Sequence, residues 1–345
     1  MDVKKKDRIV LICCLAAIVV SIGIGFLGAK MFSSFFSTTD VIDEEGVVID
    51  GNFVDNNVNN AVYSAMVARI GNKLYASLYP GGIYFPGGIY EISESGIRRL
   101  IDEYAEIAVI DGELYAEFTN GAKKYDFESG KFVSQDDVSS IYSMKSGDIY
   151  IDYAFNETER ELKHIARFIY KGKTLKTIEA DFSLYYYIDG DNIFYTNSDN
   201  ELRRFDVSDE TDWLVYDFGD GYPESLIIED GKLVILSSQY DPFVSGVYYL
   251  GLDETEIIFK PIEESEEYLA FNVYDGKVYV AFTGGKLNVF DLATGEKKTL
   301  AEKNNIYHVY IVDDKWVYFI DIDAKGNDSL WRVTQDGSIV EKVMD

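Results

Sequence analysis

Cysteine and histidine are scarce in this chain of 345 residues, which contains two of each. Cys13 and Cys14 are adjacent and stand near the beginning, and the rest of the sequence has no thiol. Disulfide bonds therefore do not hold the body together, and a body of this size buries enough apolar surface without them. His164 and His308 fall in different repeats, with no cysteine or second histidine at metal spacing, which excludes a structural zinc site.

Proline and basic residues are also few. Five prolines fit a body made mostly of paired strands, because proline cannot donate to a β-ladder. Lys and Arg total 32 against 60 Asp and Glu, so the formal net charge is -28. Such a surface repels nucleic acid and anionic lipid headgroups. Nucleic acid is excluded as a partner, whereas cations, basic proteins and neutral polymers such as glycans are compatible. Solubility of an extracellular protein explains the acidity without any partner.

Aromatic residues are abundant, at 15% of the chain with 27 tyrosines, and 47% of residues are hydrophobic. A chain of this length and composition buries a large core, which excludes a disordered protein. Tyrosine favours pleated, half-buried surfaces and the rims of sheets. A platform of tyrosines that stacks on a ligand is the alternative interpretation.

Residues 9–29 form a run of 21 residues without a charge, preceded by the basic residues 1–8. At about 1.5 Å per residue a helix of this length spans about 30 Å, the thickness of a bilayer core. We expect one transmembrane helix with a cytoplasmic N-terminus and the remaining chain outside the plasma membrane. A cleaved signal peptide is the alternative, but the run is long for one and Leu27 is bulky for a cleavage site after Ala29.

Residues 30–59 are rich in Ser, Asp, Glu and Asn, which is typical of a solvated stalk between the membrane and a domain at 60–345. Within the stalk, Val47, Val48 and Ile49 form a short apolar run. We expect this run to be a stray strand that adds to the last repeat. The exported part has no cysteine and is rich in Lys, Ile, Asn and Tyr, which favours a bacterial cell surface.

One pattern recurs seven times between residues 60 and 345: two hairpins, and so four apolar runs, in each unit. The first turns carry Gly, Asn or Asp, which tolerate the positive φ of two-residue hairpins. They are spaced 41, 35, 43, 41, 45 and 38 residues apart. These turns are Gly71-Asn72, Asp111-Gly112, Ser146-Gly147, Asp189-Gly190, Asp230-Gly231, Asp275-Gly276 and Asp313-Asp314. Second turns follow at Ser95-Gly96, Ser129-Gly130, Thr294-Gly295 and Asp336-Gly337, and near Gly172, Asp209 and Asp253.

The runs between the turns are strands by pattern. Residues 277–283 alternate apolar and polar positions, whereas residues 233–236 are apolar throughout. Middle strands covered on both faces and outer strands that meet water explain both kinds. Residues 157–166 have helical charge character, and a long hairpin loop is at least as good an interpretation. The sequence predicts an all-β, seven-bladed β-propeller, with six or eight blades as alternatives.

Two units carry residues that resemble the YWTD-type propellers of low-density-lipoprotein-receptor proteins and their bacterial relatives of unknown function. These are residues 316–321 (Trp-Val-Tyr-Phe-Ile-Asp) with 329–333, and residues 193–197 (Ile-Phe-Tyr-Thr-Asn). Most units depart from the full tetrad, and the receptor propellers have six units. Residues 291–296 resemble a turn of quinoprotein-type and envelope-assembly propellers. The resemblance implies the fold and does not transfer a ligand.

The sequence contains one weak metal-binding motif and no catalytic motif. Residues 321–328 resemble the opening of a calcium loop, but Lys325 takes a ligand position and Arg332 replaces the closing glutamate. A polar hairpin tip explains the motif equally, so we expect no cofactor, with calcium as the alternative. Neither a sialidase box nor a Gly-x-Ser-x-Gly turn is present.

The most unusual local feature is a tandem copy at residues 79–84 and 85–90, each with an aromatic residue, Pro-Gly-Gly, Ile and Tyr. Two such turns would extend a loop of the first unit and project aromatic rings that stack on sugars or anchor a protein. A slipped duplication that only lengthens a hairpin is the alternative. The candidate binding residues are Tyr79, Tyr84, Phe85 and Tyr90.

These observations favour a membrane-anchored binding or scaffold module for a protein or glycan partner at the cell envelope, rather than an enzyme. Eight cytoplasmic residues are too few for a signalling domain. An extracellular carbohydrate-active hydrolase, with carboxylates lining the central channel, is the principal alternative. A third interpretation is an accessory subunit for envelope assembly.

Overall fold

The computed structural model describes residues 41–42, 46–54, 66–79, 87–119, 121–134, 141, 149–158, 161–180, 185–229, 231–240, 243–251, 258–263 and 268–344. The chain divides into two compact units, Met1–Ile42 and Asp43–Asp345. The first unit contributes β1 (Val41–Ile42) to this description. The predicted tail at 1–8 and membrane helix at 9–29 lie outside the described residues. Among the residues that are described, no helix is long and apolar enough to cross a bilayer.

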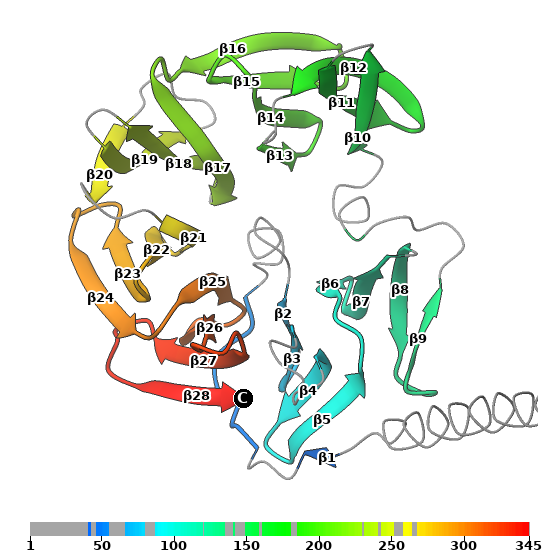
Figure 1. The fold of residues 1–345 in the computed structure, drawn as a ribbon, viewed down its shortest axis with the longest axis vertical. Coiled ribbons are helices and arrows are strands. Elements are labelled where there is room, and N and C mark those ends of the chain that lie inside the picture. The colour runs from blue at the N-terminus through cyan, green and yellow to red at the C-terminus, as the bar shows by residue number, and fades with distance from the viewer. Residues whose placement is uncertain are drawn as a thin grey trace, which may run out of the picture. The chain divides into compact units, whose positions relative to one another are not determined.

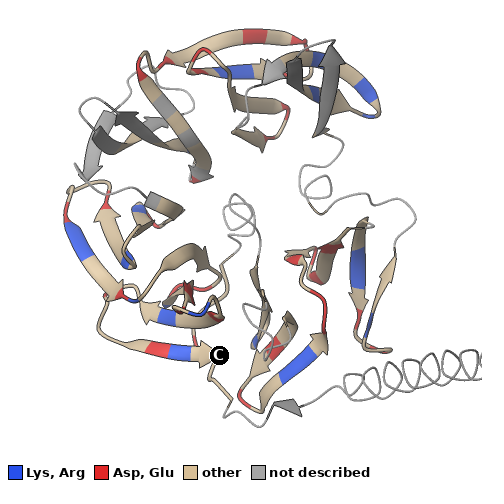
Figure 2. Cartoon of the chain, viewed as in Figure 1, with Lys and Arg blue, Asp and Glu red and all other residues tan. Residues whose placement is uncertain are grey.

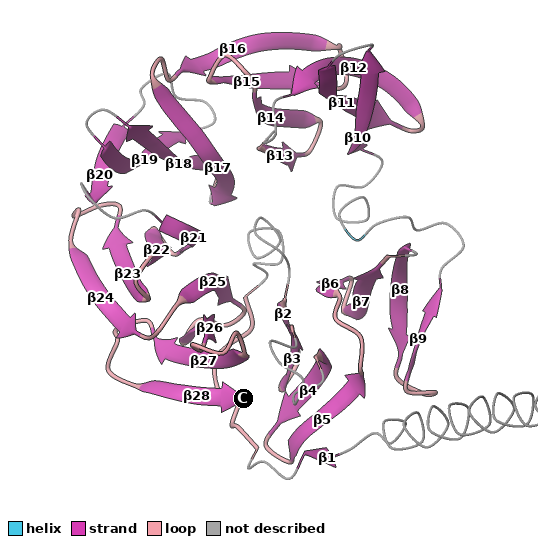
Figure 3. Ribbon diagram, viewed as in Figure 1, coloured by secondary structure: helices cyan, strands magenta, loops and turns pink. Residues whose placement is uncertain are grey.

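The second unit is built from strands (Figures 1 and 3). Its first strands are β2 (Val67–Ile70), β3 (Lys73–Leu78), β4 (Gly88–Ser93), β5 (Gly96–Ile101), β6 (Glu106–Ile110), β7 (Glu113–Phe118), β8 (Gly121–Asp126), β9 (Lys131–Ser134), β10 (Ile149–Thr158), β11 (Glu161–Tyr170), β12 (Lys173–Ala180), β13 (Tyr186–Asp189) and β14 (Asn192–Thr196). The rest are β15 (Glu201–Asp206), β16 (Thr211–Asp217), β17 (Gly221–Glu229), β18 (Lys232–Tyr240), β19 (Phe243–Gly251), β20 (Ile258–Glu263), β21 (Tyr268–Tyr274), β22 (Lys277–Phe282), β23 (Lys286–Asp291), β24 (Lys297–Glu302), β25 (Ile306–Ile311), β26 (Trp316–Ile322), β27 (Asp328–Thr334) and β28 (Val340–Met344).

Strands that follow one another in sequence pair antiparallel, and in the described part of the chain they make seven sheets. These are β2–β5, β6–β9, β10–β12, β13–β16, β17–β20, β21–β24 and β25–β28. Neighbouring sheets bury apolar side chains against each other. Phe194 of β14 packs with Leu226 of β17, for example, and Val280 of β22 packs with Phe271 and Ile227. The fold is therefore all-β and propeller-like.

Burial follows the position of each strand within its sheet. Residues 233–236 of β18 are fully buried, as expected for a middle strand covered on both faces. The outer strand β24 exposes four of its six residues. Among the described residues, adjacent pairs of basic residues fall on third or fourth strands, at β5, β8, β15 and β24 (Figure 2). The continuous apolar run thus marks a middle strand, but the alternating run at 277–283 does not mark an outer one: it falls on the middle strand β22, whose residues 278–282 are fully buried.

Several predicted hairpin turns are confirmed by their backbone geometry. Both residues of Asp111-Gly112 and of Asp275-Gly276 have positive φ, between 51° and 77°, which matches the primed turns of two-residue hairpins. The fourth turn lies one residue later than predicted, at Gly190-Asp191, because β13 extends through Asp189. Ser146-Gly147 and Asp253 lie outside the described residues.

Of residues 157–166, those that the structure describes, 157–158 and 161–166, belong to neither a helix nor a loop. Instead, β10 and β11 pair continuously from Ile149 opposite Tyr170 to Thr158 opposite Glu161. The helical interpretation and the long loop are therefore both wrong for the described residues of this stretch.

Residues 46–54, which we call the strap, lie between the first and last sheets. The strap is not a regular strand: its only ladder contact among the described residues is a bridge between Phe53 and Asp313. At the start of the strap, the amide of Val47 donates to Ser93 O of the first sheet at 3.1 Å. At its end, the amide of Val54 donates to Val312 O, next to the last sheet, at 3.2 Å. The apolar run was expected to add to the last repeat; it contacts both repeats instead.

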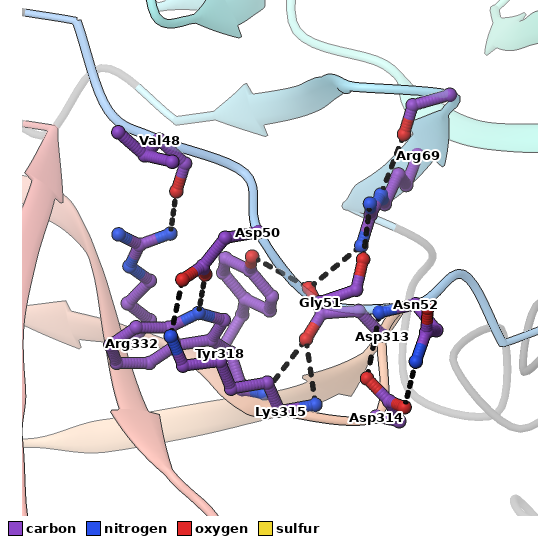
Figure 4. A network of polar contacts seen from close by, with 12 residues as sticks. Val48, Asp50, Gly51, Asn52, Arg69, Asp313, Asp314, Lys315, Tyr318 and Arg332 are labelled. Atoms are coloured by element: carbon purple, nitrogen blue, oxygen red, sulfur yellow. Dashed lines mark hydrogen bonds and ion pairs between the residues drawn. The ribbon is translucent and has the colours of Figure 1, made fainter.

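Polar side chains fix the strap in place (Figure 4). Arg332 of β27 donates to Val48 O at 2.8 Å, and Trp316 Nε1 donates to Asp50 at 2.8 Å. Arg69 of β2 donates to Gly51 O at 2.6 Å and pairs with Asp313, at 3.2 Å. First and last sheets are therefore joined through a segment that precedes both in the sequence.

Candidate functional site

A group of polar and aromatic side chains lies where the last sheet meets the first, at one end of the strands. In a meander of four strands, the second-to-third loops and the connections between sheets share one end. Tyr79 follows β3, Tyr104 precedes β6, Tyr307 is the second residue of β25 and Asp328 begins β27. All four residues therefore belong to the same end of their sheets. We call these four residues the tyrosine corner, which is unrelated to the motif of that name in Greek-key sandwiches.

Asp328 is the centre of the tyrosine corner. Its carboxylate accepts a hydrogen bond from the backbone amide of Tyr79 at 2.9 Å and another from the Tyr307 hydroxyl. The Asp328 side chain is only 9% exposed, whereas Tyr79 is 59% exposed. The carboxylate thus forms the floor of the corner and joins two sheets.

Two tyrosine rings stand at right angles beside this carboxylate. The centroids of Tyr79 and Tyr104 are 5.4 Å apart, and their planes meet at 86°. Edge-to-face packing of this kind is a favoured arrangement of aromatic pairs. An exposed ring held in a fixed orientation offers a flat apolar surface to a ligand at little cost in side-chain entropy.

Burial sets the protonation states in the tyrosine corner. It raises the pKa of Asp328 above its ordinary value, which the two hydrogen bonds partly oppose. Burial, with the nearby charges of Glu106 and Asp328, raises the pKa of Tyr104 to about 12. The pKa of Tyr307 is raised by burial and by Asp328. Both phenols therefore remain protonated donors at neutral pH.

The predicted binding residues are distributed unequally. Tyr79 lies in the tyrosine corner and is exposed. Tyr84 and Phe85 lie outside the described residues. Tyr90 is the third residue of β4 and is 4% exposed, so its ring is part of the core in this structure and does not project from a loop. The binding loop itself stays a prediction.

Sequence reasoning missed Tyr104, Tyr307 and Asp328. Asp328 was considered only as the last residue of the calcium-like motif, and no local signal distinguishes the two tyrosines from the others in the chain. Their proximity depends on contacts between repeats, which no spacing within one repeat encodes.

The calcium-like motif is a hydrogen-bonded hairpin tip. Asp323 accepts from the amides of Lys325, at 2.7 Å, and Asn327, at 3.0 Å, while Asp321 accepts from the amide of Asn305 at 2.8 Å. With Asp328 bonded to Tyr79, these carboxylates serve different backbone donors. Within the described ranges, no group of three or more His, Cys, Asp or Glu residues is arranged to hold a metal ion.

The histidines lie on separate strands, His164 on β11 and His308 on β25. His308 packs against Tyr307, with ring centroids 4.3 Å apart, and its Nδ1 is buried without a hydrogen-bond partner. Burial lowers the pKa of His308 to about 4. The imidazole is therefore neutral at physiological pH and acts as a packed side chain of β25, the first strand of the last sheet.

Comparison with known proteins gives a fold and no family. No protein-family model matches this chain. No curated protein matches it either. The resemblance to YWTD repeats therefore has no support beyond the residues that suggested it.

Solved structures of low sequence identity share the architecture. One is a Mycobacterium tuberculosis puromycin-hydrolyzing peptidase, with a TM-score of 0.53, 13% identity and coverage of 87% of this chain. An oligogalacturonate lyase from Vibrio parahaemolyticus has a TM-score of 0.55 at 8% identity, covering 84% of this chain and 92% of the lyase. The AfRom2 CNH domain has a TM-score of 0.50 at 13% identity, covering 84% and 98%. These neighbours are β-propeller-like. This chain spans 57% of the peptidase, and at such identities the likeness concerns the fold alone.

Proposed function

We propose that this protein is a seven-bladed β-propeller held outside the plasma membrane by a helix at residues 9–29, and that it binds a protein or glycan partner at the cell envelope. The seven sheets of the described residues support the blade number, and the uncharged run supports the anchor. The binding site we assign is the tyrosine corner. An exposed, oriented ring beside a buried carboxylate carries this assignment.

The chemistry of the corner suits recognition. Tyr79 offers an apolar face to a sugar ring or to a side chain of a partner, and aromatic residues dominate binding energy at interfaces. Asp328, which accepts the backbone amide of Tyr79, and Tyr307 add a carboxylate acceptor and a hydroxyl group to the same corner. Since these groups come from two sheets that meet at the ring closure, folding positions them before any partner arrives.

An extracellular hydrolase is the second candidate. The observation that favours it is Asp328, because a buried carboxyl with a raised pKa is a common feature of a general acid. Glycoside hydrolysis needs a second carboxylate about 5 to 10 Å away. Release of product from cell-wall glycans that is abolished by Asp328→Asn would favour this candidate over simple binding.

The test is partner capture by the full-length protein in detergent, with glycan arrays and pull-downs from envelope extracts. Tyr79→Ala should weaken the captured interaction about 30-fold, the effect of removing a strong interface anchor. Trp213→Ala is the matched control, since Trp213 is also exposed, at 38%, but lies on the outer strand β16. Equal capture by wild type and Tyr79→Ala would contradict the assigned site.

A further inference from the structure

The charge of Asp328 has no cationic partner in the described part of the chain. Its carboxylate receives only the Tyr79 amide and the Tyr307 hydroxyl, and burial is the largest influence on its ionisation. Two of the three other buried carboxylates in the described part of the chain are paired with cations: Glu91 contacts Lys73 at 3.1 Å and Arg98 at 3.2 Å, and Asp313 contacts Arg69 at 3.2 Å. The third, Asp321, accepts the amide of Asn305 at 2.8 Å. A buried carboxylate without a counter-charge is costly unless something compensates it.

The groups above Asp328 also favour a cation. Tyrosine rings carry negative charge on their faces and attract a cation placed within about 6 Å of the centroid. Tyr79 and Tyr104 meet at 86°, so a group in the angle between them contacts two aromatic walls. The same contact would seat that group beside Asp328, which the amide of Tyr79 holds at 2.9 Å.

The net charge of the chain also favours a cationic ligand. The formal net charge of -28 raises the local concentration of cations and lowers that of anions around the whole body. A neutral sugar would stack on Tyr79 but would leave the charge of Asp328 uncompensated. An anionic ligand would be repelled by it.

We infer that the tyrosine corner binds an alkylammonium group, seated between the rings of Tyr79 and Tyr104 and paired with the carboxylate of Asp328. This inference rests on the proposed binding function and names the chemical class of its ligand. A primary ammonium, as on a lysine side chain, and a quaternary ammonium share this chemistry. The probes below separate the two.

Full-length protein in detergent is titrated with choline, with n-butylammonium and with 3,3-dimethylbutan-1-ol, which has the shape of choline without its charge. Binding is followed by calorimetry and by the shift in Tm at constant ionic strength. We expect both cations to bind and the neutral alcohol to bind at least about tenfold more weakly. The cation that binds with the higher affinity shows whether the site prefers a quaternary or a primary ammonium group. Equal binding of choline and the alcohol, or binding of neither cation, overturns the inference.

Three variants locate the cation. Asp328→Asn keeps an oxygen that accepts from the Tyr79 amide but removes the charge, and should weaken ammonium binding about tenfold or more. Tyr104→Leu removes one aromatic wall and should weaken it about 2- to 30-fold. Tyr104→Phe retains the ring and should bind within about twofold of wild type. Circular dichroism checks that each variant is folded. Unchanged affinity in folded Asp328→Asn overturns the assigned seat.

Competition separates this inference from the proposed function. If a partner is captured in a manner sensitive to Tyr79→Ala, and excess choline or n-butylammonium displaces it, both stand. If the partner is captured through Tyr79 but neither ammonium salt displaces it beyond the effect of sodium chloride, the binding function stands and the ammonium inference fails.

Discussion

Replacement of Arg69 by Met should destabilise the second unit strongly, because Arg69 joins the first sheet to both the strap and the last sheet. The Arg69 side chain is 6% exposed. Its guanidinium donates to Gly71 O at 2.8 Å and to Gly51 O at 2.6 Å, and it lies 3.2 Å from Asp313. Asp313 is fully buried, and Tyr318 also donates to it, at 2.9 Å.

The magnitude follows from what the substitution leaves behind. Methionine retains most of the aliphatic packing but provides no donor and no charge, so Asp313 becomes a buried carboxylate without a cation. Removing one partner of a buried ion pair costs about 3–5 kcal/mol. Burial already raises the pKa of Asp313, and loss of Arg69 raises it further. Since protonated Asp313 needs no cation, the loss in the free energy of unfolding should shrink as the pH falls.

Urea denaturation followed by tryptophan fluorescence measures the effect. The matched control is Arg98→Met on β5: the Arg98 side chain is 44% exposed, and Lys73 remains as a cation for Glu91. This control should cost less than about 1 kcal/mol. The double variant Arg69→Met with Asp313→Asn should recover part of the loss, because no buried charge is stranded. If Arg69→Met lowers the free energy of unfolding no more than Arg98→Met does, the contact between the first and last sheets does not depend on this ion pair and our reasoning about the strap is wrong.

Three further results are expected. Burial lowers the pKa of His308 from 6.5 to about 4, so between these pH values the unfolded state binds a proton that the folded state does not. The free energy of unfolding should therefore fall by roughly 3 kcal/mol as the pH drops from 6.5 to 4. His308→Phe should flatten this pH dependence in acid denaturation. Gly51→Ala places a Cβ 2.5 Å from the Asp313 carboxylate and should cost roughly 1–3 kcal/mol in urea denaturation, unless the strap shifts freely. A cysteine introduced at the exposed Ser129 should react with an impermeant maleimide on intact cells, and labelling only after lysis would contradict the proposed orientation.

Most of the fold was predictable because its signals are local. A turn such as Asp275-Gly276 needs residues that tolerate positive φ, and the burial of residues 233–236 follows from an uninterrupted apolar run. The hairpin at Gly190-Asp191 was misplaced by one residue, since Asp and Gly fit adjacent positions about equally. Its register is set by burial of side chains such as Ile193, opposite Ile188, which turn chemistry does not reveal.

The candidate site was predictable only in part, because its contacts are not local. Tyr79 stood out through the tandem repeat that it begins. Its partner Asp328 lies 249 residues away, and the two meet only because the last sheet packs against the first. The strap shows the same limit: Val47 to Ile49 was expected to be a strand, yet polar side chains of two sheets determine its course.

The strap has a consequence for biosynthesis. Asn52 is translated 262 residues before its partner Asp314, and Val48 is translated 284 residues before Arg332. At ribosomal rates these intervals last on the order of 10 to 60 s. During that time each completed hairpin can form from its own neighbours, whereas the strap lacks its partners on the last sheet and Arg69 lacks Asp313. The nascent propeller-like unit is therefore an open chain of sheets until its last repeat emerges, and the edge of its first sheet stays uncovered until then.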